Sequence, residues 1–185
     1  MVHTPLRIGI VSPADWLEPE LLEAGAADLR TRGHQVKIHP HCYEQSGRMA
    51  GNDQTRAAAL MEMYQDNEID ILWAAKGGYG STRLLDKLDL NLIQQNPKPL
   101  IGYSDQTSLL NALFTIKDVS GWTGPMIKEL ALKKYPKAID QLLEFLQGSP
   151  FDTTELLSEA QVLQAGEAEG VIVGGTPACL VRLLG

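Results

Sequence analysis

Short apolar runs alternate with amphipathic stretches along most of the chain. The runs typical of buried strands cover residues 6–11, 35–38, 69–75, 99–102 and 170–173. Apolar residues at helical spacing predict helices over residues 20–30, 53–67, 81–88, 105–116, 136–147 and 178–184. Strands and helices alternate without two-residue hairpin signals, so we expect an α/β fold: a mainly parallel sheet flanked by helices.

The pattern also predicts how the chain is divided. Residues 1–150 form an N-terminal α/β domain, and residues 151–169 are a polar, Glu-rich linker. Residues 170–185 then read as the start of a truncated C-terminal domain; alternatively, the last helix docks back on the sheet. Under the first interpretation the apolar face of that helix, with Leu180, Leu183 and Leu184, lacks a partner, and we expect some self-association, such as a homodimer.

Composition and charge narrow the function classes. The 185 residues are 44% hydrophobic and carry a formal charge of −7, with no basic cluster, which makes nucleic acid an improbable partner. No apolar run is long enough for a membrane span, and the start lacks the pattern of a signal peptide. The distant Cys42 and Cys179 fit free thiols, so we expect a cytoplasmic location.

A glycine-rich segment follows the third predicted strand: Lys76-Gly77-Gly78-Tyr79-Gly80-Ser81. Its glycines allow the backbone to approach a ligand closely and to present N–H groups to an anion or a polarised carbonyl. The segment lacks the residue order of a Walker loop or a dinucleotide loop. It is either a ligand-binding loop or only a turn.

A serine follows the fourth predicted strand, in Ile101-Gly102-Tyr103-Ser104-Asp105-Gln106-Thr107. A sharp turn there lifts the hydroxyl above the sheet, as in a nucleophile elbow, although Gln106 stands where such elbows usually have a second glycine. The alternative is that Ser104 or Asp105 is only a helix N-cap.

The segment His39-Pro40-His41-Cys42 is a third candidate, because alternate histidines can share one face as metal ligands do. No second ligand pair accompanies it, so we expect surface or rim histidines, no metal site and no cofactor.

Taken together, these segments resemble one family, the serine LD-carboxypeptidases, which include muramoyltetrapeptide carboxypeptidase and the microcin-immunity peptidases. The resemblance spans the chain and rests on Ile8-Gly9-Ile10-Val11-Ser12-Pro13, on residues 75–85 with Gly77-Gly78-Tyr79-Gly80, on Gly102-Tyr103-Ser104-Asp105, on Thr123-Gly124-Pro125-Met126 and on residues 170–175.

The resemblance implies release of a terminal D-alanine from a murein tetrapeptide in peptidoglycan recycling. It implies that Ser104 is the nucleophile and that the backbone N–H groups of Asp105 and Gly78 form the oxyanion hole. Gly77 and Tyr79 would contact substrate, and Arg83 would be either a structural group or a partner of the substrate carboxylate.

One departure from the family pattern concerns the catalytic base. The family takes its triad Glu and His from a C-terminal domain, whereas the histidines here all precede Ser104, and neither Glu167 nor Glu169 matches the motif. We therefore hold two hypotheses: the chain is the N-terminal part of an LD-carboxypeptidase, inactive alone, or it is a non-catalytic module that binds a murein peptide or another small anion.

Overall fold

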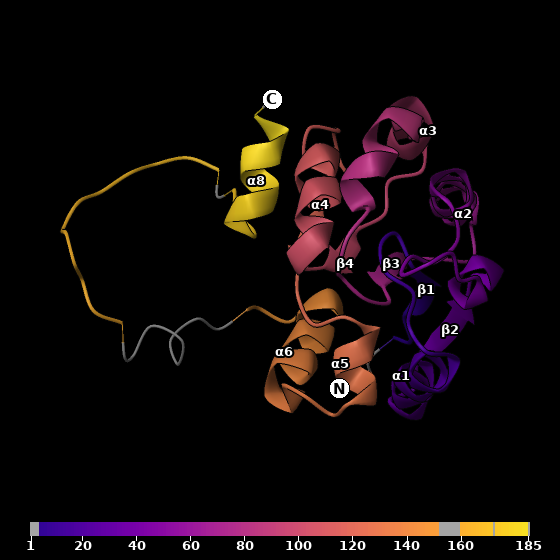
Figure 1. The fold of residues 1–185 in the computed structure, drawn as a ribbon. Coiled ribbons are helices and arrows are strands. Elements are labelled where there is room, and N and C mark those ends of the chain that lie inside the picture. The colour runs from indigo at the N-terminus through magenta and orange to yellow at the C-terminus, as the bar shows by residue number, and fades with distance from the viewer. Residues whose placement is uncertain (1–3, 152–159, 172, 185) are drawn as a thin grey trace.

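The computed structural model describes residues 4–151, 160–171 and 173–184, and these contain one five-stranded sheet (Figure 1). The strands are β1 (Arg7–Val11), β2 (Gln35–Ile38), β3 (Ile71–Ala74), β4 (Leu100–Gly102) and β5 (Gly121–Thr123). All neighbouring strands are parallel, in the order β2-β1-β3-β4-β5. The predicted α/β fold with a parallel sheet is confirmed.

Helices connect the strands. The α-helices are α1 (Pro19–Thr31), α2 (Asp53–Gln65), α3 (Leu90–Gln95), α4 (Thr107–Leu113), α5 (Ile127–Ala131), α6 (Pro136–Leu146) and α8 (Pro177–Leu183). Short 3₁₀ turns are η1 (Pro40–Tyr43), η2 (Ser81–Lys87) and η3 (Ser104–Gln106). Proline opens α1, α6 and α8, where its missing N–H costs nothing, and the Asn52 side chain caps α2 by accepting the Thr55 N–H at 2.9 Å.

Alternating strand residues divide the core into two layers. One face of the sheet packs against α1, α5 and α6, through residues such as Ile8, Ile10 and Trp73. The other face packs against α2, α3 and α4, through residues such as Val11, Leu72 and Leu100. This two-sided burial explains why the central strands are continuously apolar in sequence.

The prediction of a strand at residues 170–173 is wrong for the residues described. Residues 170, 171 and 173 lie in no strand, and residue 172 lies outside the described residues. Val171 and Val173 are 72% and 58% exposed, and the strand beside β4 at the edge of the sheet is β5. The sequence pattern did not predict β5, α3 or α5, which are all short.

The described end of the chain lies beside α4. The segment 160–171 lies away from the sheet and its helices, and α8 lies alongside α4 (Figure 1). Thr107 Oγ1 accepts the Thr176 N–H at 3.0 Å, and Asn111 donates to the Gly174 carbonyl at 3.1 Å. Leu180 and Leu183 are half-buried, while Leu184 is 84% exposed, so self-association through this helix stays a prediction. The domain boundaries at 150 and 170 stay predictions as well.

Candidate active site

Loops at the carboxyl ends of three neighbouring strands form the candidate site. The chain leaves β1 toward Asp15, leaves β3 into the glycine loop (residues 77–80) and leaves β4 into the elbow (residues 103–105). Because β2 lies on one side of β1 and β3 on the other, the loops after β1 and β3 flank the point where the order of the strands reverses. Ligands of open α/β sheets bind at such a point.

Ser104 occupies a strained position as the first residue of η3, just after β4. Its φ angle is +62°, in the left-handed region, which costs a residue with a Cβ about 1–2 kcal/mol. This backbone supports the interpretation as an elbow, because an ordinary N-cap has extended backbone angles. The half-buried Ser104 side chain is turned toward the glycine loop, so that a Cβ built on Gly77 would lie 3.4 Å from Ser104 Oγ.

A cavity of about 220 Å³ opens at Ser104. Its lining residues come from the glycine loop and the elbow, from α5, and from the residues just before the glycine loop and α5: Lys76, Gly77, Gly78, Tyr103, Ser104, Met126, Lys128 and Glu129. The structure therefore brings Ser104, Gly77 and Gly78 together around one cavity. Asp105, Tyr79 and Arg83 do not line it.

Asp15 fixes the shape of the glycine loop. Gly78 has φ +112°, and a Cβ on it would lie 2.2 Å from Asp15 Cγ, so only glycine fits there. Asp15 Oδ1 accepts the Tyr79 N–H at 3.1 Å, and Arg48 donates to both carboxylate oxygens at 2.9 and 2.7 Å. Sequence reasoning missed Asp15 and Arg48. The only signal for Asp15 was its place in the loop that follows the first strand.

Two side chains join the elbow to the glycine loop. The buried carboxylate of Asp105 accepts the Ser81 N–H at 2.8 Å. Gln106, at the place of the expected second glycine, donates to the Lys76 carbonyl at 3.1 Å. The larger side chain thus holds the glycine loop against the elbow. The two hydrogen bonds fix the position of Gly78 relative to Ser104.

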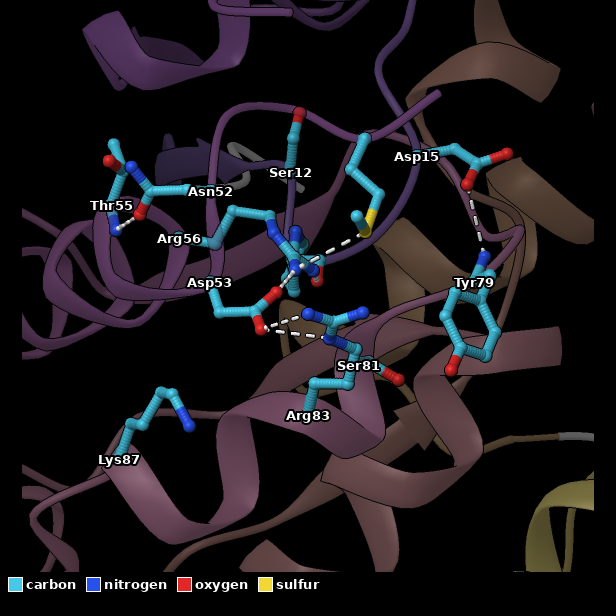
Figure 2. A network of polar contacts seen from close by, with 12 residues as sticks. Ser12, Asp15, Asn52, Asp53, Thr55, Arg56, Tyr79, Ser81, Arg83 and Lys87 are labelled. Carbon is cyan, nitrogen blue, oxygen red and sulfur yellow. Dashed lines mark hydrogen bonds and ion pairs between the residues drawn. The ribbon is translucent and has the colours of Figure 1, made fainter. Parts of the chain in front are cut away.

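Arg83 is engaged away from the cavity. Its Nε donates to Asp53 Oδ2 at 2.8 Å, and Arg56 reaches the other oxygen of the same carboxylate (Figure 2). Burial raises the pKa of Asp53, but the Arg83 hydrogen bond and the two positive charges outweigh it and lower that pKa overall. This geometry favours the structural one of the two roles considered for Arg83.

Arg83→Gln is expected to leave the affinity for a murein peptide unchanged and to reduce stability by less than about 1 kcal/mol. The Arg83 side chain is 48% exposed, and solvent-exposed ion pairs contribute little. Peptide titration and urea unfolding of the variant check this. A tenfold loss of affinity would assign Arg83 to the substrate instead.

The histidines lie elsewhere. His39 Nε2 is 2.9 Å from Glu62 Oε2, and the His41 ring accepts the Ser12 N–H at 3.2 Å. His41 is 2% exposed, so its interpretation as a surface or rim residue is wrong: the ring is buried to satisfy the backbone after β1. Of the described histidines, none lines the Ser104 cavity. The described residues also contain no group of three or more His, Cys, Asp or Glu arranged to hold a metal ion, and no helix long and apolar enough to cross a bilayer.

His41 is expected to make stability depend on pH. Burial, assisted by the neighbouring His39, lowers the pKa of His41 from 6.5 to about 4. As the pH falls, His41 therefore takes up its proton at a higher pH in the unfolded chain than in the folded one. The contribution of neutral His41 to the free energy of unfolding is complete above about pH 6.5 and is lost toward about pH 4. The loss amounts to about 3 kcal/mol. In urea unfolding at pH 7 and pH 4.5, His41→Gln should remove most of this decrease. The prediction would be contradicted if His41→Gln lost as much stability between pH 7 and pH 4.5 as the wild type.

The end of the chain also reaches the site. The Cys179 thiol in α8 lies 3.7 Å from the Ser104 carbonyl oxygen, and the Arg182 guanidinium lies 5.9 Å from the centre of the Tyr79 ring. Cys179 and Cys42 are both free and buried, as expected of thiols that form no disulfide.

Several known proteins are similar to this chain in sequence and in fold. Residues 8–124 match the model of the LD-carboxypeptidase N-terminal domain. A probable murein peptide carboxypeptidase of Bacillus subtilis is 34% identical over 96% of this chain and 56% of the relative. The structure of muramoyltetrapeptide carboxypeptidase from Oxalobacter formigenes superposes with a TM-score of 0.68 at 29% identity, over 77% of this chain and 48% of that one. An MccF-like protein from Bacillus anthracis gives 0.71 at 27% identity, over 77% and 45%. The chain thus spans about half the length of these proteins.

Proposed function

Because the chain belongs to the LD-carboxypeptidase family, as its motifs predicted, we propose that it is the part of a serine-type murein tetrapeptide carboxypeptidase that carries the nucleophile. The observation that carries the proposal is the left-handed Ser104, turned toward Gly77 at the rim of a cavity. The relatives' names support a carboxypeptidase acting on murein peptides. The terminal D-alanine as leaving group, the serine mechanism, cytoplasmic recycling and the role of each residue are our proposal.

In this mechanism Ser104 Oγ attacks the carbonyl carbon of the terminal amide, and the carbonyl oxygen becomes an oxyanion. The backbone N–H groups of Asp105 and Gly78 stabilise that charge. A general base accepts the Ser104 hydroxyl proton and passes it to the D-alanine nitrogen, the C–N bond breaks and D-alanine leaves, and water then hydrolyses the acyl-serine to restore the Ser104 hydroxyl. The Asp15 and Gln106 contacts support this step because they hold the glycine loop and the elbow before substrate binds.

We propose that the general base is a residue outside those that the structure describes. Within them, no side chain forms a hydrogen bond with Ser104 Oγ, and His34, His39 and His41 do not line the cavity. A serine without a base is a weak nucleophile, so we propose that the chain is inactive alone. The same observation favours the second candidate, a module that binds the peptide without cleaving it.

A release assay separates the two functions. Murein tetrapeptide is incubated with the chain alone and with the chain fused to the C-terminal half of the Bacillus subtilis relative, and free D-alanine is quantified by chiral chromatography. We expect release only by the fusion. Peptide binding without release by the fusion would favour the binding module, and the absence of both would contradict the murein assignment.

A further inference from the structure

A carboxypeptidase needs a positive group for the terminal carboxylate of its substrate, and the cavity at Ser104 offers two candidates. Lys76 and Lys128 both line it, against the single carboxylate of Glu129. The cavity is therefore locally positive in a chain whose formal charge is −7. Arg83, the other cation considered for this role, is bound to Asp53.

Hydrogen bonds within the protein already engage the charged groups of Glu129 and Lys76, and this makes both less available to a ligand than Lys128. Glu129 Oε2 accepts the Met126 N–H at 3.0 Å, and Oε1 accepts the Tyr103 hydroxyl at 3.1 Å, so both oxygens are engaged. Burial, with the Glu129 charge second, raises the pKa of Tyr103 to about 12, which keeps this donor protonated. Lys76 Nζ donates to the Trp16 carbonyl at 3.0 Å.

The backbone of Lys128 is held by a hydrogen bond, whereas its ammonium group has no ion-pair partner among the described residues. Its N–H donates to the Ala75 carbonyl at 3.0 Å, which places its Cα beside the end of β3 and the start of the glycine loop. Among the residues that the structure describes, no carboxylate forms an ion pair with its ammonium group. The residue Lys128 is of intermediate exposure, and an ammonium group with no ion-pair partner among the described residues can form a charge-assisted hydrogen bond with an anion.

We propose that Lys128 binds the α-carboxylate of the peptide's terminal residue and so makes the site select free carboxyl ends. This inference rests on the proposed function. A peptide bound in this way has its last amide between Ser104 and Lys128, which line the same cavity. The ammonium group then discriminates a peptide acid from a peptide amide or a longer chain.

The test compares two probes, the murein tetrapeptide ending in D-alanine and the same peptide with an amidated end. Affinities are measured by calorimetry with the whole chain, so the readout does not depend on turnover. The wild-type chain is expected to prefer the acid by about 10- to 100-fold, as for a hydrogen bond to a charged group. Lys128→Met should abolish the preference by lowering the affinity for the peptide acid and leaving the affinity for the peptide amide unchanged. Lys128→Arg should restore most of the preference.

Lys134→Met is the matched control, since it removes the same charge from an exposed position after α5. Its acid preference should equal that of the wild type. An unchanged preference in a folded Lys128→Met variant, or an equal loss in Lys134→Met, would overturn the role of Lys128 while leaving the proposed function intact. If the wild-type chain binds neither peptide, this inference is overturned, whereas the proposed function is decided separately by D-alanine release from the fusion.

Discussion

Ser104→Ala is expected to reduce D-alanine release by the fused enzyme about 10⁴- to 10⁶-fold, the range found when a serine nucleophile is removed. Without Oγ no acyl intermediate forms, and the glycine loop alone contributes only residual stabilisation. Peptide affinity should change less than about threefold, because the cavity and Lys128 remain in place. Rates and dissociation constants of the same preparation measure both effects.

The control is Ser149→Ala, which removes a hydroxyl group after α6 and should keep full turnover. A Ser104→Ala enzyme that retained its turnover would show that another group is the nucleophile. Ser104→Gly adds a second readout: it should be as inactive as the alanine variant but about 1 kcal/mol more stable, because glycine adopts φ +62° without the Cβ clash.

Gly78→Ala is expected to disrupt both stability and the site. The new Cβ would lie 2.2 Å from Asp15 Cγ, so either the carboxylate or the loop must move, and the Tyr79 N–H then loses its acceptor. Strain at φ +112° adds to this, and together the effects should cost about 3 kcal/mol. Release by the fused enzyme should fall at least about 100-fold, because Gly78 is proposed to supply an oxyanion N–H.

Gly33→Ala is the matched control for backbone strain. Gly33 also has a positive φ, +91°, but a Cβ there has nothing within 4 Å. It should cost about 1 kcal/mol and leave release unchanged. Urea unfolding of the two variants measures the difference, and equal losses would contradict the proposed clash with Asp15.

The sequence predicted the parts of the fold that are marked by local patterns. The strands β1, β3 and β4 are apolar because they are covered on both faces. An apolar run of this kind can be recognised in the sequence without knowing which strands pair with it. The strand β5 was missed because Gly121, Trp122 and Thr123 are too few to form a pattern. Residues 170–173 gave a wrong strand prediction for the opposite reason: the three residues after Gly170 are β-branched, a local signal for a strand, but the described ones among them pair with no strand of the sheet.

The site residues that could be predicted are those whose role is marked by the sequence of a single short segment. Ser104 and the glycine loop each follow a strand and carry their own signal. Asp15 was not predictable in its role, because the backbone N–H that it accepts is 64 residues further along the chain. Lys128 reaches the cavity only through the short helix α5, which no periodicity indicated.

The sheet has a further consequence at its two edges. The edge strands β2 and β5 contain four and three residues, and each is followed within two positions by a proline, Pro40 or Pro125. Short edges that end at proline offer few free backbone groups to a strand from another molecule. The edges of the described sheet are therefore poor templates for edge-to-edge aggregation.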